Sequence, residues 1–309
     1  MLRQTLIYLS KQQRINNFVC TNPLASRFAS RFVAGDTLDT AVEAVRRLGA
    51  SGTTATLDML GESVSTDAEA EAAVAGALSI LERIAAERLT ANLSVKLTQL
   101  GFALDATRFS RNIRRILDRA KQLGIFVRID MEGSEHTQRT LDLFEKELHP
   151  VYGDGVGIVI QSYLRRSAAD TERLVAARAK VRLCKGAYSE PATVAFPDKR
   201  DVARSYVEIT ERLLRSGQYH GIATHDAAII EQAKRFAKEQ GIGPERFEFQ
   251  MLYGIRRDLQ NALRSEGYNV RIYVPFGTHW YPYFMRRLAE APSTLAFIPW
   301  SVLKESLGR

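Results

Sequence analysis

Two adjacent arginines, Arg286 and Arg287, lie in the stretch YPYFMRRLAE (281–290), whose pattern otherwise predicts an ordinary helix. Side chains three and four residues apart share one face of a helix, so Tyr283 lies beside both arginines and both can reach Glu290. Taken alone, such a pair is most often a solvated basic turn at a protein surface. The residues that precede this helix favour another interpretation, in which the arginines bind an anionic ligand.

Polar side chains recur at the ends of the short apolar segments upstream of this helix. They are Lys96, Asp130, Glu132, Gln161, Arg182, Lys185, Tyr188, Thr224, His225, Asp226, Tyr253, Tyr273 and His279. Lysine and arginine side chains that converge from several segments predict more than one anionic ligand, because a single carboxylate cannot use so many cationic donors.

Two of these side chains also have purely structural interpretations. Lys96 alternates with apolar neighbours, and an ion pair with Asp130 on the next segment would satisfy it without any ligand. A lone histidine such as His225 is more often a hydrogen-bonding core residue than a catalyst. No spacing of His, Cys and carboxylate residues typical of a metal site accompanies it, so we expect no metal.

The polar residues end segments rich in apolar and β-branched side chains, which alternate with longer stretches of helical periodicity from residue 51 onward. This alternation is typical of βα units that build a parallel sheet. The predicted strands cover residues 53–60, 93–100, 125–132, 156–163, 181–188, 220–226, 247–254 and 270–277.

Local signals mark the helices between these strands. Thr66 and Glu69 have the spacing of a capping box, and Gly124 ends a second helix. The apolar stripe of that second helix consists of Phe109, Ile113, Ile116, Leu117 and Ala120. Eight strands, each followed by a helix, predict an α/β fold of the (β/α)8 TIM-barrel type, because an open doubly wound sheet would need a topological break.

We therefore predict a single domain over residues 1–309, with a catalytic barrel at 51–290 and a C-terminal segment with a short helix at 291–309. A helical segment at 1–50 precedes the barrel, and the stretch 36–48 within it has an apolar helix face. Active sites of such barrels lie at the C-terminal ends of the strands. The polar residues at the strand ends, together with the helix of Arg286 and Arg287, then form one site.

Composition excludes several classes of function. The chain has 43 lysines and arginines and 35 acidic residues, which gives a net charge of +8. The charges of both signs are interspersed and no aromatic-basic RNA motif occurs, so we expect no nucleic-acid partner. No apolar run approaches the roughly 20 residues of a membrane span. Cys20 and Cys184 form neither a zinc spacing nor a disulfide framework, which suits the cytoplasm. Both phosphate-binding glycine motifs are absent, so a nucleotide cofactor must bind in a manner specific to the barrel.

Residues 1–35 contain no aspartate or glutamate, although five lysines and arginines lie among their apolar residues. This segment can be a targeting peptide, a helix on the inner face of the cytoplasmic membrane, or a basic cap on the barrel. The sequence leaves these three alternatives open, and it leaves the oligomeric state open as well.

Four stretches together resemble the proline dehydrogenase family: VRLCKGAY (181–188), ATHD (223–226), FEFQMLYGIR (247–256) and RIYVPFGTHWYPYFMRRLAE (271–290). The resemblance runs in order from about Leu57 to Glu290. It implies an FAD-dependent barrel that oxidises L-proline to Δ1-pyrroline-5-carboxylate by hydride transfer to the flavin N5 and passes electrons to a membrane quinone. The chain resembles the single-function bacterial enzymes, because 309 residues leave no room for an additional aldehyde dehydrogenase domain.

The resemblance also implies roles at the substrate. The residues concerned are Glu62, Lys96, Asp130, Tyr188, Leu252, Tyr273, Tyr283, Arg286 and Arg287. By resemblance, the lysine and the two arginines clamp the proline carboxylate, and the two tyrosines at 273 and 283 wall the ring. Leu252 and Tyr188 close its apolar side, and Asp130 orients the cationic and phenolic groups. Glu62 matches a family acid that pairs with Arg286 as a gate.

At the flavin, the resemblance implies contacts from Gln161, Arg182, Lys185, Gly186, Ala187, Thr224 and His225. Arg182 would lie near the reactive nitrogen, and the other six would contact the isoalloxazine ring or the ribityl and phosphate chain. A glycine at 186 allows close approach of the backbone to a ligand in any case. Ser189 stands where the family often has an aromatic residue.

Three other functions compete with this one. Another flavin barrel, such as a methylenetetrahydrofolate reductase, would use NAD(P)H and a folate. A Schiff-base aldolase would use Lys96 or Lys185 as nucleophile. A basic binding module without activity would not concentrate functional side chains at strand ends. The paired arginines and tyrosines of the last helix favour a small amino-acid carboxylate as ligand.

Overall fold

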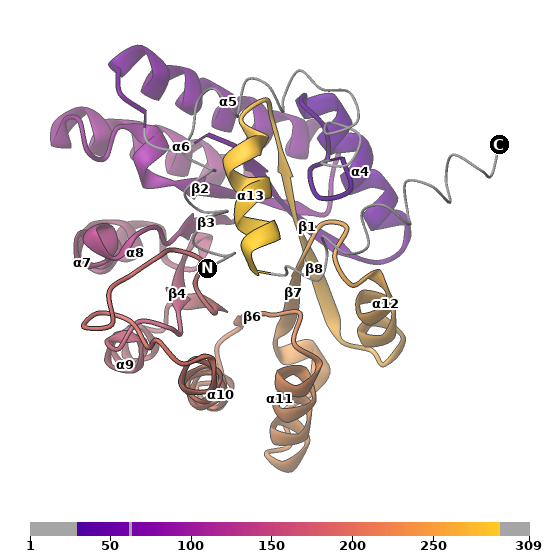
Figure 1. Ribbon diagram of the computed structural model, residues 1–309. Coiled ribbons are helices and arrows are strands. Elements are labelled where there is room, and N and C mark those ends of the chain that lie inside the picture. Colours follow the sequence, from indigo (N-terminus) through magenta and orange to yellow (C-terminus); the bar gives the residue numbers. More distant parts are fainter. Residues whose placement is uncertain (1–29, 62–63, 291–309) are drawn as a thin grey trace.

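In the computed structural model, which describes residues 30–61 and 64–290, eight parallel strands close into a barrel in the order β1 to β8 (Figure 1). The strands are β1 Thr54–Met59, β2 Ala91–Lys96, β3 Val127–Asp130, β4 Val156–Gln161, β5 Lys180–Cys184, β6 Gly221–Ala223, β7 Glu248–Leu252 and β8 Asn269–Phe276. Pairing of β1 with β8, in which Thr54 lies opposite Arg271, closes the sheet. The predicted (β/α)8 barrel is confirmed.

Helices follow the strands and surround the barrel. They are α4 Leu38–Ala50, α5 Asp67–Ala86, α6 Ala106–Leu123, α7 Ser134–Leu143, α8 His149–Tyr152, α9 Ser167–Ala176, α10 Lys199–Arg215, α11 Ala227–Glu239, α12 Arg257–Ser265 and α13 Trp280–Glu290. The predicted capping box is present, since Thr66 Oγ1 accepts from Glu69 N–H and the Glu69 carboxylate accepts from Thr66 N–H. Gly124 ends α6 in the left-handed conformation, as predicted.

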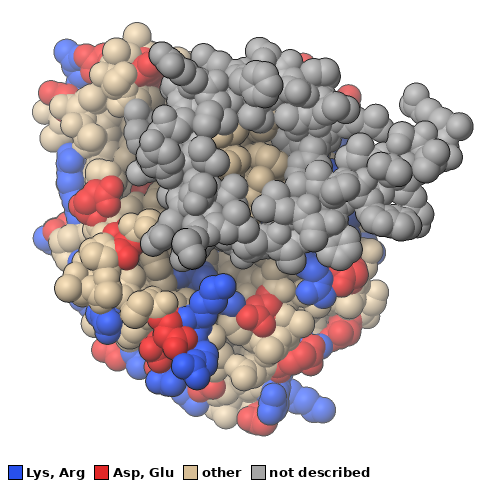
Figure 2. Space-filling model, in the orientation of Figure 1, with Lys and Arg blue, Asp and Glu red and all other residues tan. Residues whose placement is uncertain are grey.

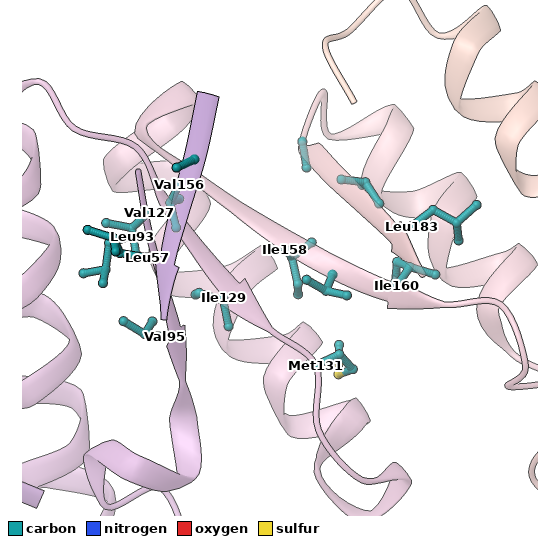
Figure 3. Close-up of a cluster of buried hydrophobic side chains, with 14 of the residues drawn as sticks. Leu57, Leu93, Val95, Val127, Ile129, Met131, Val156, Ile158, Ile160 and Leu183 are labelled. Atoms are coloured by element: carbon teal, nitrogen blue, oxygen red, sulfur yellow. The ribbon is translucent and has the colours of Figure 1, made fainter. Parts of the chain in front are cut away.

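The main apolar core lies between the strands and the outer helices. Figure 3 shows part of it, with Leu57, Leu93, Val127, Ile129 and Ile158 contributed by four successive strands. All five side chains are buried. Because strand residues alternate between the two faces of a sheet, the residues between them point into the barrel.

The barrel interior is polar. Ser94 on β2 and Arg182 on β5 touch although their strands are not neighbours, so their side chains meet inside the barrel. Interiors of such barrels are usually filled by branched apolar residues. The buried polar side chains here include Asp58, Ser94, Lys96, Arg128, Asp130, Gln161, Arg182, Glu248 and Gln250. Hydrogen bonds must therefore replace apolar packing inside this barrel.

Helix α13 does not join the main core. It packs instead in a second cluster with Phe32, Val33 and Leu60, which follows the C-terminal end of β1. Figure 1 shows α13 near the middle of the ring formed by the outer helices. The segment before α4 is bound to the same end of the barrel, because Ala34 N–H donates to the Pro275 carbonyl at 2.8 Å. Helix α13 therefore covers the end of the barrel at which an active site is expected.

Seven of the eight predicted strands are longer than the observed ones, and β2 and β5 are two examples. Residues 97–100 form a buried 3₁₀ turn rather than the end of β2, and Gly101 follows this turn in the left-handed conformation. Strand β5 ends at Cys184, so Lys185 and Tyr188 lie in the following loop, where Gly186 has a φ of +101° that breaks the extended backbone. The predicted strands therefore ran on into a 3₁₀ turn after β2 and into a loop after β5.

The positive charge is spread over the described surface. Lysine and arginine side chains alternate with acidic ones in the view of Figure 2. Many form pairs between neighbouring helices, such as Arg115 with Glu71 and Arg119 with Glu82. Among the described helices, none combines the length and apolar character needed to cross a membrane.

Candidate active site

Lys96, the last residue of β2, is bound by Asp58 on β1. Its ammonium nitrogen lies 2.7 and 2.8 Å from the two carboxylate oxygens of Asp58 and 3.7 Å from Asp130 Oδ2. The predicted ion pair of Lys96 with Asp130 is present, but Asp58, on the other neighbouring strand, is the closer partner. A lone aspartate in the apolar segment 53–60 was the available signal for Asp58.

Asp130, the last residue of β3, connects three side chains. The Tyr273 hydroxyl donates to Oδ2 at 2.7 Å, and Ser94 Oγ and Arg182 Nη1 both donate to Oδ1 at 2.7 Å. Lys96 Nζ lies 3.2 Å from the Tyr273 hydroxyl oxygen and completes the network. Four predicted site residues are therefore joined directly, and Ser94, which the sequence analysis missed, belongs to the same network.

The two aspartates of this network differ in acidity. Burial raises the pKa of Asp58, and the charge of Lys96 offsets this effect only in part. Burial also acts on Asp130, but the charges of Arg182 and Lys96 and the bonds from Tyr273 and Ser94 outweigh it, so the pKa of Asp130 lies below its usual value. Burial and the charges of both aspartates raise the pKa of Tyr273 well above its usual value. The Tyr273 phenol is thus a neutral hydrogen-bond donor.

Gln161 and Arg182 point into the barrel from adjacent strands and are both buried. Gln161 Nε2 donates to the carbonyls of Met131 and Glu132, at 3.2 and 3.3 Å. Within residues 30–61 and 64–290, neither Gln161 Oε1 nor Arg182 Nη2 has a hydrogen-bond partner. A buried acceptor and a buried donor on adjacent strands suit a ligand that carries both kinds of group.

The loop after β5 approaches the site through Gly186. A Cβ atom at this position would collide with the ring of Tyr163, and the positive φ also requires glycine. Lys185 turns towards β6 and binds Asp226 Oδ2 at 2.8 Å. Ala187 and Tyr188 follow in the same loop and are half-buried.

His225, in the loop after β6, is held by β7. Its Nε2 accepts a hydrogen bond of 2.9 Å from Leu252 N–H, which places the imidazole proton on Nδ1. Burial and then the charge of Arg287 lower the pKa of His225 to about 4, so the ring is neutral near pH 7. The preceding Thr224 is buried and accepts from Asp226 N–H at 3.1 Å. The bond from Leu252 N–H gives His225 the structural, hydrogen-bonding role that is usual for a lone histidine.

Helix α13 is not a solvated basic turn. Tyr283 is buried, and Arg286 and Arg287 are half-buried. The Arg287 guanidinium carbon lies 5.2 Å from the centre of the Tyr283 ring, a cation–π contact. Because the charge of Arg287 also acts on His225, α13 lies close to the loop after β6. Glu62 and the side chain of Glu290 lie outside the described residues.

The structure joins the predicted residues in three groups at the same end of the barrel. Lys96, Asp130, Arg182 and Tyr273 form the central network, His225 contacts Leu252, and Tyr283 contacts Arg287. No group of three or more His, Cys, Asp and Glu side chains gathers as a metal site would in the part of the chain that the structure describes. The arrangement can therefore bind anionic groups at a buried, hydrogen-bonding surface.

Comparison with known proteins shows the family of the whole chain. A family model described as proline dehydrogenase matches residues 41–298. Proline dehydrogenase 1 of Bacillus subtilis subsp. natto is 41% identical over 306 residues, which cover 99% of this chain and 100% of the relative. Proline dehydrogenase of Deinococcus radiodurans is 42% identical over 279 residues, which cover 89% of this chain and 90% of the relative.

A solved structure has the same fold. The crystal structure of proline utilization A (PutA) from Bdellovibrio bacteriovorus, inactivated by N-propargylglycine, superposes with a TM-score of 0.82 at 23% identity. The superposition covers 93% of this chain and 38% of that one. At this identity the likeness shows the fold alone, whereas the family match and the two relatives show the family. The chain belongs to the proline dehydrogenase family.

Proposed function

We propose that this protein oxidises L-proline to Δ1-pyrroline-5-carboxylate, with FAD as hydride acceptor and a membrane quinone as final electron acceptor. The observation that carries the proposal is the buried network of Lys96, Tyr273, Asp130 and Arg182, in a barrel whose C-terminal strand end is covered by α13. Its occurrence in a member of this family, with relatives named proline dehydrogenase, supports the same activity here.

The substrate side of the site suits a small amino acid. Proline offers a carboxylate and an amine with few other polar groups, so recognition depends on charge-assisted contacts with the carboxylate. Lys96, Arg286 and Arg287 supply cationic donors from β2 and α13. Tyr273 and Tyr283 supply aromatic walls, and the side chains of Leu252 and Tyr188 add apolar surface. Clamping of the carboxylate orients the ring carbon that gives up hydride.

The buried polar atoms fit a flavin. Its isoalloxazine edge carries acceptors at N5 and O4 and a donor at N3, which match the unpaired Arg182 Nη2 and Gln161 Oε1 of the described chain. The backbone around Gly186 and Ala187, with Lys185, Thr224 and His225, would hold the remainder of FAD. When bound, FAD supplies the atom that accepts the hydride.

The protein groups keep fixed protonation states around this chemistry. Tyr273 stays a neutral donor because its pKa is raised, and His225 stays neutral because its pKa is lowered to about 4. Asp130 stays ionised and holds Arg182 and Tyr273 in place. Such preorganised dipoles and charges stabilise developing charge without reorganisation during the reaction.

The Schiff-base aldolase is less well supported. Both oxygens of Asp58 bind the Lys96 ammonium, and a carboxylate so close favours the charged form, which is not nucleophilic. Lys185 is paired with Asp226. Neither lysine therefore lies in the apolar surroundings that activate an amine.

An anaerobic titration with L-proline tests the proposed function. The purified protein should be yellow, and proline should bleach the flavin absorbance before any quinone is added. A soluble quinone analogue should then restore the absorbance. A protein that neither holds nor takes up FAD, or whose flavin proline does not bleach, would refute the proposal. Borohydride trapping of a carbonyl substrate would instead support the aldolase.

A further inference from the structure

Arg182 begins a buried row of polar side chains that runs away from α13 towards the opposite end of the barrel. Its Nε donates to Gln250 Oε1 at 2.5 Å, and Gln250 Nε2 donates to Glu248 Oε1 at 2.5 Å. Arg271 Nε donates to the same Glu248 oxygen at 2.8 Å. Arg182, Gln250 and Glu248 are each at most 5% exposed, so water does not satisfy these groups.

A glycine makes this row possible. Arg182 is on β5 and Gln250 is on β7, so β6 lies between them. At that level β6 carries Gly221, which pairs with Arg182 on one side and with Glu248 on the other. A Cβ atom at Gly221 would collide with the Gln250 amide. The side chains of Arg182 and Gln250 therefore touch across β6, which has no side chain at Gly221.

The position between these partners needs a side chain that both accepts and donates, as a carboxamide does. Arginine donates hydrogen bonds and accepts none, whereas an ionised carboxylate accepts and donates none. Gln250 accepts from Arg182 and donates to Glu248, which assigns the orientation of its amide. A carboxylate at this position would face Glu248, and an apolar side chain would leave Arg182 Nε without its acceptor.

The far end of the row is anchored on other strands. Arg271 on β8 also donates from Nη1 to the Ala55 carbonyl on β1, at 2.8 Å. Glu248 Oε2 lies 3.3 Å from the Tyr219 hydroxyl. The row thus ties Gln250 to rigid parts of the barrel and leaves its amide little freedom to turn.

Two of the three guanidinium nitrogens of Arg182 are consequently held by hydrogen bonds. Gln250 holds Nε, and Asp130 with Ser94 holds Nη1. Because a guanidinium is rigid and planar, two anchored nitrogens fix the direction of the third. The third, Nη2, is the buried donor without a partner in the described chain.

We propose that Gln250 is a positioning residue that directs Arg182 Nη2 at the flavin and thereby sets the reduction potential of the bound cofactor. The inference rests on the proposed function, because it needs bound FAD. A hydrogen-bond donor at the flavin stabilises the added electrons, and a donor that can turn away stabilises them less.

The test compares Gln250→Met with wild type in FAD-loaded enzyme, by the two-electron midpoint potential and by proline kcat/KM. We expect a more negative potential and a loss of about tenfold in kcat/KM, the effect of one hydrogen bond to a charged group. A tenfold weaker preference for reduced over oxidised flavin corresponds to about 30 mV. Gln250→Asn, which keeps the amide but is one methylene too short to reach both partners, should shift the potential in the same direction.

A double-mutant cycle separates positioning from general loosening of the barrel. In an Arg182→Met background, Gln250→Met should cause no further shift in potential, because the side chain on which it acts is gone. Gln138→Met is the matched control, since Gln138 also bridges an arginine and a carboxylate, with 2.5 Å to Arg166 and 2.9 Å to Asp142, but on the outer surface. It should leave the potential unchanged.

An unchanged potential in Gln250→Met, or an equal shift with and without Arg182, would overturn the inference. Wild-type protein that holds FAD but is not reduced by proline would refute the proposed function, while the potentials would still decide the role of Gln250. Protein that binds no flavin would overturn both.

Discussion

Asp58 holds the ammonium of Lys96 with both carboxylate oxygens, at 2.7 and 2.8 Å, whereas Asp130 stands 3.7 Å away. Both members of the pair are buried, and Asp58 is fully enclosed. The lysine is therefore fixed from the wall of the barrel before any ligand arrives. Because the lysine side chain is already ordered, it loses little conformational entropy when a carboxylate binds to it.

Asp58→Asn should lower the free energy of unfolding by about 3 kcal/mol, because it takes from a buried ammonium its closer charged partner and leaves Asp130 at 3.7 Å. Urea denaturation at neutral pH measures this loss. Asp39→Asn, which affects an exposed pair with Arg83, is the control and should cost under about 1 kcal/mol. In a Lys96→Met background the effect of Asp58→Asn should shrink, and an undiminished loss would show that the two side chains are not coupled.

Arg286→Met and Arg287→Met should each lower proline kcat/KM by about 10- to 150-fold, the range for one charge-assisted contact. Flavin content should stay unchanged if both arginines act on the substrate carboxylate. Steady-state kinetics at matched flavin occupancy measure the effect. Arg47→Met, on the outer surface of α4, is the control. Unchanged proline kinetics in both α13 variants would rule out the carboxylate clamp.

Tyr283→Ser should lower efficiency with proline but improve the ratio of efficiencies for trans-4-hydroxy-L-proline over proline. Tyr283 is buried on α13 beside Arg287, so its ring can cover the ligand whose carboxylate the arginines hold. A packed aromatic wall rejects an added hydroxyl more readily than it rearranges.

The measurement for Tyr283 is the ratio of kcat/KM values for the two substrates. Tyr283→Phe keeps the ring and its contact with Arg287, so it is the control and should not gain hydroxyproline activity. Equal losses with both substrates in Tyr283→Ser would remove this residue from the selectivity wall.

Stability should fall in mild acid because of His220. Its Nδ1 accepts from Val181 N–H at 3.1 Å, and burial, then the charge of Arg128, lower its pKa to about 3. The unfolded histidine, with a pKa near 6.5, binds a proton more readily. Its contribution is therefore fully present above about pH 6.5 and is lost as the pH falls towards about 3.

Between about pH 7 and about pH 5, His220 alone should account for about 2 kcal/mol of lost stability. Urea denaturation at both values measures the loss. His220→Asn keeps an acceptor for Val181 N–H but does not titrate, so its stability should depend less on pH. The same pH dependence in the variant and the wild type would contradict the assignment.

Deletion of residues 1–29 tests the basic N-terminal segment, which lies outside the described residues. Binding to vesicles that contain phosphatidylserine should weaken with salt and with the deletion if the segment lies on the membrane. Cosedimentation measures the binding, and circular dichroism reports on the fold. Unchanged binding would contradict membrane contact, and loss of the fold would identify the segment as a cap.

Local patterns in the sequence determined the elements. The capping box of α5 and the stripe of α6 depend on residues three and four apart, and the strands depend on apolar composition over a few residues. These interactions act within one helix turn or one strand, so the sequence alone predicts them. The ends of β2 and β5 were misplaced because the apolar residues 97–100 form a 3₁₀ turn and residues 185–188 form a loop.

The sequence also predicted which side chains form the candidate site, because polar residues at the ends of apolar segments are few and cannot be buried without partners. The partners themselves depended on the tertiary structure. Asp58 rather than Asp130 binds Lys96 most closely because β1 and β3 flank β2 on opposite sides. Gln250 reaches Arg182 only because the barrel closes and Gly221 leaves the level between them empty. Register and closure join residues far apart in the chain, and no local pattern records which inward-pointing side chains will meet.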